Sequence, residues 1–70
     1  MVVNIDELRK LMNEKANGNY NEFARQTGID VSQLYKVLNR EVGAGTVTIS
    51  KLINYINQNG LRVEDYIFLG

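Results

Sequence analysis

The chain has 70 residues, in which eight Lys and Arg balance eight Asp and Glu, and it contains no Cys and no His. A chain of this length forms one domain with a modest core, and without Cys it has no disulfides. The usual zinc ligands and the usual general base near neutral pH are missing, so we expect no enzyme, no metal and no cofactor. Short apolar runs and the absence of a signal-peptide pattern lead us to expect a cytoplasmic protein with no membrane association.

The first predicted helix runs from about Ile5 to Ala16. Asn4 can cap it, and Glu7 follows at capping-box spacing. Its apolar residues recur every three or four positions, as one face of a helix requires, and Asn17-Gly18 predicts its end. The adjacent basic pair Arg9 and Lys10 is interpreted as a solvated face.

Two short helices are predicted next, the second from about Tyr20 to Thr27 and the third directly after Asp30. Asn19 and Asp30 are the predicted caps, and an acidic or amide residue follows each of them after three positions. Gly28 lies between the helices, where a left-handed residue is needed. The third helix is expected to bury Leu34, Val37 and Leu38.

A loop is predicted from Arg40 to Val47, and a fourth helix from Ile49 to about Gln58 with Thr48 as its cap. A last turn or two is expected over residues 63–69. Strands are an alternative for the runs 47–49 and 66–69, because periodicity does not exclude a strand in such short pieces. The expected fold class is all-α, with four to five helices in one compact domain over residues 1–70.

The segment YNEFARQTGIDVSQLYKVLN, residues 20–39, has the features of two helices that cross at a steep angle. Such a pair needs a small residue where the helices touch, which Ala24 provides, and a glycine at the turn, which Gly28 provides. Buried side chains are needed at fixed positions, and Phe23 and Ile29 are among them. The first turn of the third helix is then left protruding, in a form that fits the major groove of DNA.

This segment resembles the helix-turn-helix of the phage-repressor and Cro-like family, also called lambda-repressor-like, and the resemblance extends over about residues 4–68. It implies a compact five-helix domain from a phage or bacterium that acts as a dimer on double-stranded DNA. By position in the motif, the implied base-reading residues are Val31, Ser32 and Lys36, flanked by Gln33 and Tyr35. The implied contacts to the DNA backbone are Asn19, Tyr20, Asn21 and Arg40.

The chemistry of these side chains fits their implied roles. Val31 can pack on a thymine methyl group, and Lys36 can donate to O6 or N7 of guanine. Tyr20 and Arg40 are suited to holding phosphates. The sequence therefore predicts a repressor-like transcription regulator that reads a short operator, with no small-molecule substrate.

Several alternatives stay open at this point. A repressor, a Cro-like antagonist and an excision factor are not distinguished, and neither the operator nor the regulated genes can be read from the sequence. The zero net charge also fits a protein-interaction module that uses the same helical fold without DNA. For the apolar tail Tyr66, Ile67, Phe68 and Leu69 two roles are open, folding back over the core and forming a homodimer interface, and a mixture of the two is favoured.

Overall fold

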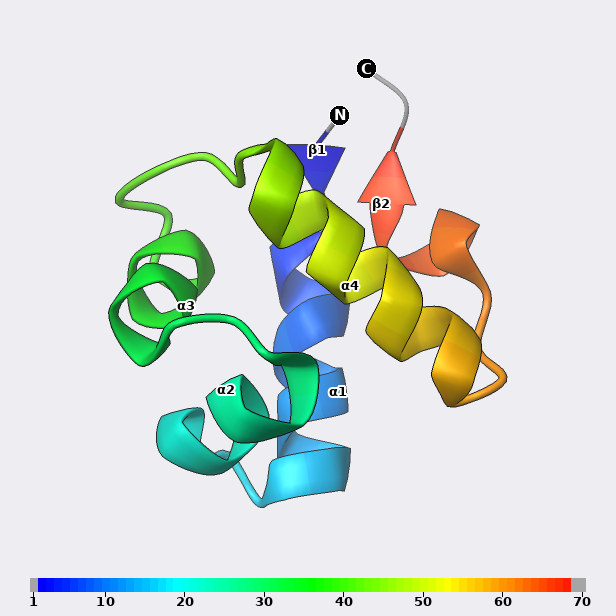
Figure 1. Cartoon of the computed structure of the whole chain (residues 1–70), viewed down its shortest axis with the longest axis horizontal. Helices are drawn as coiled ribbons and strands as arrows, with labels where there is room; N and C mark the ends of the chain where they lie inside the picture. The colour runs from blue at the N-terminus through cyan, green and yellow to red at the C-terminus, as the bar shows by residue number, and fades with distance from the viewer. Residues whose placement is uncertain (1, 69–70) are drawn as a thin grey trace.

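The computed structural model describes residues 2–68, and four helices make up most of it (Figure 1). This arrangement confirms the predicted all-α fold class. In chain order the elements are β1 (Val2–Val3), α1 (Ile5–Ala16), α2 (Tyr20–Thr27), α3 (Val31–Leu38), α4 (Thr46–Gln58), the 3-10 helix η1 (Val63–Asp65) and β2 (Ile67–Phe68).

The three predicted caps are confirmed by hydrogen bonds at the starts of α1, α2 and α3. In each case a side-chain oxygen accepts from a backbone N–H group of the first turn, which has no partner within the helix. Asn4 accepts from Glu7 at 3.3 Å, Asn19 accepts from Glu22 at 3.0 Å, and Asp30 accepts from Ser32 at 3.0 Å and Gln33 at 3.4 Å.

The predicted start of α4 was wrong by three residues. The helix begins at Thr46 rather than Ile49, and its cap is Gly45, which makes no side-chain bond. Thr48 does not cap the helix but is buried in its first turn. The extra residues Thr46 and Val47 are exposed, so they add nothing to the apolar pattern from which the helix was predicted.

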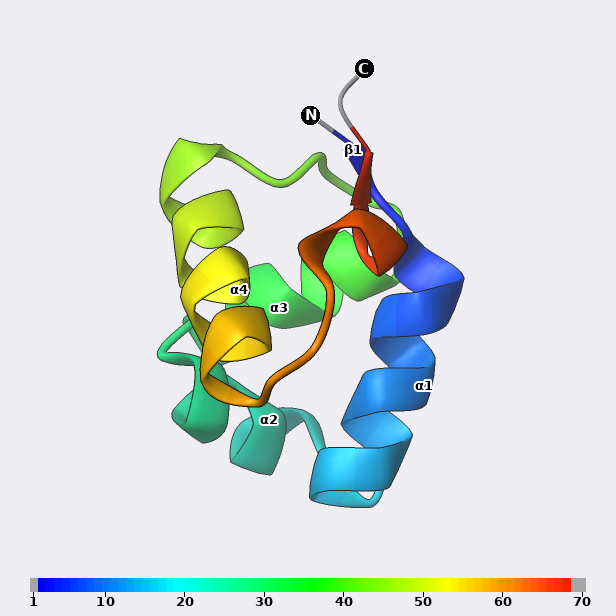
Figure 2. The same ribbon diagram turned by 90° about the vertical axis from the view of Figure 1, so that its right-hand side faces the viewer.

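The tail forms a single 3-10 turn followed by a strand, where the family resemblance implied a fifth helix. Strand β2 pairs antiparallel with β1, with Val2 opposite Phe68 and Val3 opposite Ile67. Of the two strand alternatives, the one at 66–69 is therefore confirmed in part, and the one at 47–49 is wrong because that segment is helical. Leu69 lies outside the described residues. Figure 1 shows the two strands side by side at one end of the molecule, and in Figure 2 they overlap at the same end.

The core lies between the four helices and is closed at one end by the strand pair. Two aromatic rings meet inside it, since Phe23 of α2 and Tyr55 of α4 are edge to face with centroids 5.5 Å apart. The largest fully buried side chains come from all four helices: Leu8, Leu11, Phe23, Leu34, Val37, Leu38, Leu52 and Ile56.

Candidate nucleic-acid interface

The turn between α2 and α3 is held by a glycine and a buried hydroxyl. Gly28 has φ +77°, a conformation that side chains rarely adopt. The Thr27 hydroxyl donates to the carbonyl of Phe23 at 2.9 Å and accepts from the N–H of Ile29 at 3.3 Å. The hydroxyl thus ties the last turn of α2 to Ile29 in the turn before α3. The role of Gly28 was predicted, whereas that of Thr27 was not, because a threonine at the end of a helix is ordinary in sequence.

The exposed side of α3 carries most of the residues that sequence reasoning assigned to base reading. Ser32, Tyr35 and Lys36 are exposed, while Val31 and Gln33 are half-buried. Four of these five line a shallow depression, and Gln33 does not belong to it. The loop after α3 adds Glu41 to the lining, a residue that sequence reasoning missed.

Tyr20, at the start of α2, lies within a polar network that spans three helices. Its hydroxyl accepts from Asn39 Nδ2 at 3.3 Å and from Arg9 Nη1 at 3.4 Å. The bond from Asn39 is the main reason that the Tyr20 pKa lies below its ordinary value; Arg9 adds to the effect and partial burial opposes it. The Tyr20 ring also packs on that of Tyr35, with centroids 5.2 Å apart. Tyr20 is therefore held beside α3 while its own O–H remains a donor.

Arg9 was predicted to lie on a solvated face, and that prediction was wrong. Its side chain is half-buried, and Nη2 donates to the carbonyl of Leu38 at 2.8 Å and to Asn39 Oδ1 at 3.0 Å. Lys10, its neighbour, is exposed and pairs with Glu7 at 3.2 Å, as a solvated face would. Nothing in the sequence distinguishes the two cations, because the acceptors for Arg9 come from a helix about thirty residues away.

Arg40 ends α3 in a left-handed conformation, with φ 59°. Its N–H donates to the carbonyl of Val37 at 3.1 Å, and the N–H of Glu41 donates to that of Lys36 at 2.8 Å. These two bonds form a Schellman motif, in which glycine is the usual residue at the position of Arg40. The guanidinium extends toward α1, where it lies 3.4 Å from a carboxylate oxygen of Asp6, and both side chains are exposed.

The remaining predicted backbone contacts, Asn19 and Asn21, are exposed at the start of α2. Together with Tyr20 they stand at the positive end of the α2 dipole, which favours phosphate. Lys36 takes part in none of the four ion pairs found within residues 2–68. Lys36 is therefore a cation outside any ion pair of the described residues, although Glu41 lines the same depression.

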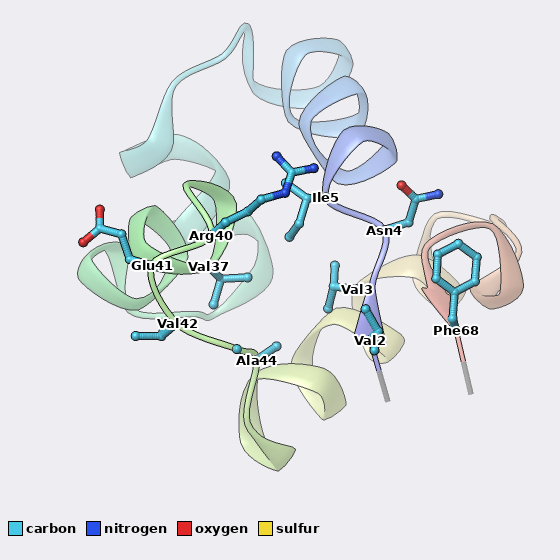
Figure 3. Close-up of a pocket in the computed structure, with 11 residues that line it drawn as sticks. Val2, Val3, Asn4, Ile5, Val37, Arg40, Glu41, Val42, Ala44 and Phe68 are labelled. Atoms are coloured by element: carbon cyan, nitrogen blue, oxygen red, sulfur yellow. The ribbon is translucent and has the colours of Figure 1, made fainter. Parts of the chain in front are cut away.

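A second hollow lies between the start of α1, the strand pair and the loop after α3 (Figure 3). It has a volume of about 590 Å³ and is mostly lined by apolar side chains, among them Val3, Ile5 and Phe68. Figure 3 shows Arg40 extending over Ile5, while Glu41 points away from the strand pair. This hollow borders the candidate interface through the loop but contains none of the predicted base-reading residues.

Other kinds of site find no support in the part of the chain that the structure describes. Within residues 2–68 no three acidic side chains come together as a candidate metal site. No helix in the same range is long and apolar enough to cross a membrane.

The comparisons with known proteins point to one family. The model of the Cro/C1-type HTH DNA-binding domain matches residues 7–59, which is more than half of the chain and contains α2, α3 and α4 in full. Searches of curated proteins and of solved structures gave no match. The matched stretch includes the candidate interface from Asn19 to Glu41 and excludes the strand pair.

Proposed function

Because the chain belongs to the Cro/C1-type helix-turn-helix DNA-binding family, we propose that it is a repressor-like transcription regulator that reads a short operator in double-stranded DNA. DNA binding in general follows from the family. The observation that carries the finer proposal is the exposed face of α3, presented by a turn that Thr27 and Gly28 hold in place. An exposed helix of this kind enters the major groove, where base edges differ.

In this proposal α3 reads the bases and the flanking residues hold the phosphates. Val31, Ser32 and Lys36 contact base edges, with Gln33 and Tyr35 beside them. The start of α2 binds a phosphate through its backbone N–H groups and the Tyr20 hydroxyl. Arg40 binds a second phosphate through its guanidinium. The residues for the phosphate contacts are Asn19, Tyr20, Asn21 and Arg40.

We further propose that the protein acts as a homodimer through its C-terminal strand. Phe68 is 50% exposed and lies opposite Val2, which is 58% exposed, so the strand pair offers an apolar patch. Ile67 is only 5% exposed and Tyr66 is half-buried, so both pack into the core of their own chain. The dimer contact would therefore rest on Phe68 and Val2. A dimer places two recognition helices ~34 Å apart, one turn of DNA.

The dimer is tested by sedimentation of the full chain and of Phe68→Ser. We expect the native chain to gain mass with concentration and the variant to stay monomeric. Val47→Ser is the matched control, since Val47 is also exposed but lies on α4. If the native chain stays monomeric at every concentration, the dimer proposal is wrong, but the DNA-binding proposal is unaffected.

The DNA interface is tested by titrating the isotope-labelled protein with a mixed-sequence duplex at low salt. We expect amide shifts at residues 19–21, 31–36 and 40, and these shifts should fade as salt rises, because phosphate contacts release counterions. Lys36→Ala should weaken binding, whereas Lys51→Ala, on α4, should not. Absence of shifts at these residues would favour the alternative, a protein-interaction module, which the neutral net charge supports.

A further inference from the structure

The depression on the exposed side of α3 has a lining of mixed chemistry. Its residues are Val31, Ser32, Tyr35, Lys36 and Glu41, and its volume is about 340 Å³. Val31 and Tyr35 lie one helical turn apart on α3, so their side chains are neighbours. Glu41 reaches the same depression from the loop, where its N–H is bonded to the carbonyl of Lys36.

The apolar wall of the depression is formed before any ligand arrives. Val31 is half-buried and packs against the core. Tyr35 is 49% exposed, but its ring rests on that of Tyr20, which is itself bonded to Arg9 and Asn39. A wall held in this way loses little side-chain freedom when a ligand covers it, which lowers the cost of binding.

The polar side of the depression is formed by Lys36, Glu41 and the hydroxyl of Ser32, which both donates and accepts. The ammonium group of Lys36 donates only, and the carboxylate of Glu41 accepts only. None of the ion pairs within residues 2–68 includes either side chain. The depression therefore presents an apolar surface, a donor and an acceptor within one small area.

The four base-pair orientations differ in what they show in the major groove. Thymine shows a methyl group and the acceptor O4, and the adenine paired with it shows the N6 amine as a donor. Guanine shows two acceptors, and cytosine shows an amine without a methyl group. An apolar surface, a donor and an acceptor are together the complement of a T·A pair.

We propose that this depression selects a T·A base pair in each half-site. The methyl group of thymine packs against Val31 and Tyr35, Lys36 donates to O4, and Glu41 accepts from the N6 amine of adenine. The inference rests on the operator-reading function proposed above and extends it in two ways. It assigns Lys36 to thymine rather than guanine, and it adds Glu41 as a specificity-determining residue.

Glu41 gives specificity rather than overall affinity. When guanine takes the place of adenine, the carboxylate meets the acceptors O6 and N7 at that base, and the cytosine opposite has no methyl group for the apolar wall, so that pair is disfavoured. Its negative charge repels phosphates, so Glu41 lowers the overall affinity for DNA while it favours one base pair. We therefore expect Glu41→Ala to lose affinity for the selected duplex, where it lacks the bond to adenine, and to bind other duplexes at least as tightly as the native chain, so that it discriminates less between sequences.

The first arm of the test changes only the DNA. Duplexes selected from a random library are bound by the full-length protein, and each conserved thymine is replaced in turn by deoxyuridine, which lacks the methyl group. We expect one position per half-site to lose about fourfold in affinity, since a buried methyl group contributes about 0.8 kcal/mol. Replacing the paired adenine by purine, which lacks the N6 amine, should cost about tenfold at the same position.

The second arm changes the protein and asks whether each effect disappears. Val31→Ala should reduce the ratio of the affinities for the thymine and deoxyuridine duplexes, and the remainder is due to Tyr35. Glu41→Ala should bring the ratio of the affinities for the adenine and purine duplexes close to one. Val63→Ala is the matched control for the first variant, because Val63 is also half-buried against the core but lies in η1. The Val63→Ala variant should show the same loss of affinity as the native chain when thymine is replaced by deoxyuridine.

Two results would overturn the inference. The first leaves the proposed DNA-binding function standing, and the second contradicts it as well. If the selected duplex binds with a clear salt dependence but deoxyuridine changes nothing at any position, the T·A assignment is wrong and DNA reading stands. If no duplex binds with any salt dependence, both the assignment and the proposed function are wrong.

Discussion

The guanidinium of Arg9, on α1, donates to the carbonyl oxygen of Leu38, the last residue of α3, across 2.8 Å. That carbonyl is one of the four at the end of the helix without a partner inside it. The same guanidinium also bonds to Asn39 and to the Tyr20 hydroxyl. A residue outside the helix-turn-helix thus connects α1 to both of its helices, and the cation stands at the negative end of the α3 dipole.

We predict that Arg9→Ala lowers the free energy of unfolding by about 1–2 kcal/mol, since it leaves the partly buried carbonyl of Leu38 unpaired and removes the bonds to Asn39 and Tyr20. Arg9→Lys should recover little of this loss, because one ammonium group cannot reproduce the planar fork of the guanidinium. Denaturant unfolding measures both changes. Lys10→Ala is the control, and its expected change is below about 0.5 kcal/mol because Lys10 forms only an exposed ion pair. Equal losses for the two alanine variants would show that the network contributes nothing.

We predict that Arg40→Gly weakens DNA binding while stability stays equal or rises by up to about 1 kcal/mol. Glycine fits the left-handed conformation of this position better than arginine does. Arg40→Asn should weaken DNA binding in the same way with a smaller gain in stability, because asparagine carries no charge and tolerates the conformation less well than glycine. Affinity measured against salt concentration should show a shallower slope for both variants. An unchanged slope would mean that Arg40 touches no phosphate.

We predict that Asp6→Asn tightens DNA binding. The Asp6 carboxylate lies 3.4 Å from the Arg40 guanidinium and competes with a phosphate for the same cation. The gain should be largest at low salt and fade as salt rises, because both groups are exposed. Glu14→Gln removes one negative charge elsewhere on α1 and serves as the control. A similar gain in that variant would indicate a general charge effect rather than competition for Arg40.

We predict that Gly28→Ala lowers the free energy of unfolding by about 1 kcal/mol, the cost of a side chain in the left-handed region. No atom lies within 4 Å of the added Cβ, so the backbone conformation is the whole cause. Gly43→Ala also adds a Cβ in open space, but there φ lies outside the left-handed region. Thermal or denaturant unfolding should therefore find Gly43→Ala neutral or slightly stabilising. A similar loss in both variants would contradict this account of the turn.

We predict that Tyr20 ionises at lower pH than Tyr55. The hydrogen bond from Asn39 is the largest contribution that lowers the Tyr20 pKa, whereas burial raises that of Tyr55. Because the pKa of Tyr20 is lower in the folded chain, its ionisation favours the folded state. This stabilisation is fully present above the pKa of the unfolded chain, near 10, and is lost as pH falls through the pKa of the folded chain. Tyr55 has the opposite sign, and its contribution is lost as pH rises. In an absorbance titration, Tyr20→Phe should remove the earliest phenolate transition; its persistence would contradict the assignment.

Much of the fold could be predicted from local patterns in the sequence. The caps at Asn4, Asn19 and Asp30 and the glycine at 28 determine where α1, α2 and α3 begin and end, and each of these signals acts within a few residues. The buried faces followed from apolar spacing for the same reason. The start of α4 was missed because no capping side chain marks it.

The tertiary structure decided what depends on residues far apart in the chain. Val2 and Phe68 form a strand pair only because the two ends of the chain meet, and neither short segment would be a strand by itself. Arg9 and Lys10 are both basic residues in one helix, yet only Arg9 reaches the acceptors that α3 brings to it. Glu41 joins Val31 in one depression only because α3 ends in a turn that folds the chain back. Local hydrogen bonding and apolar periodicity thus determine the helices and their inner faces, whereas contacts between distant residues determine which polar side chains share a site.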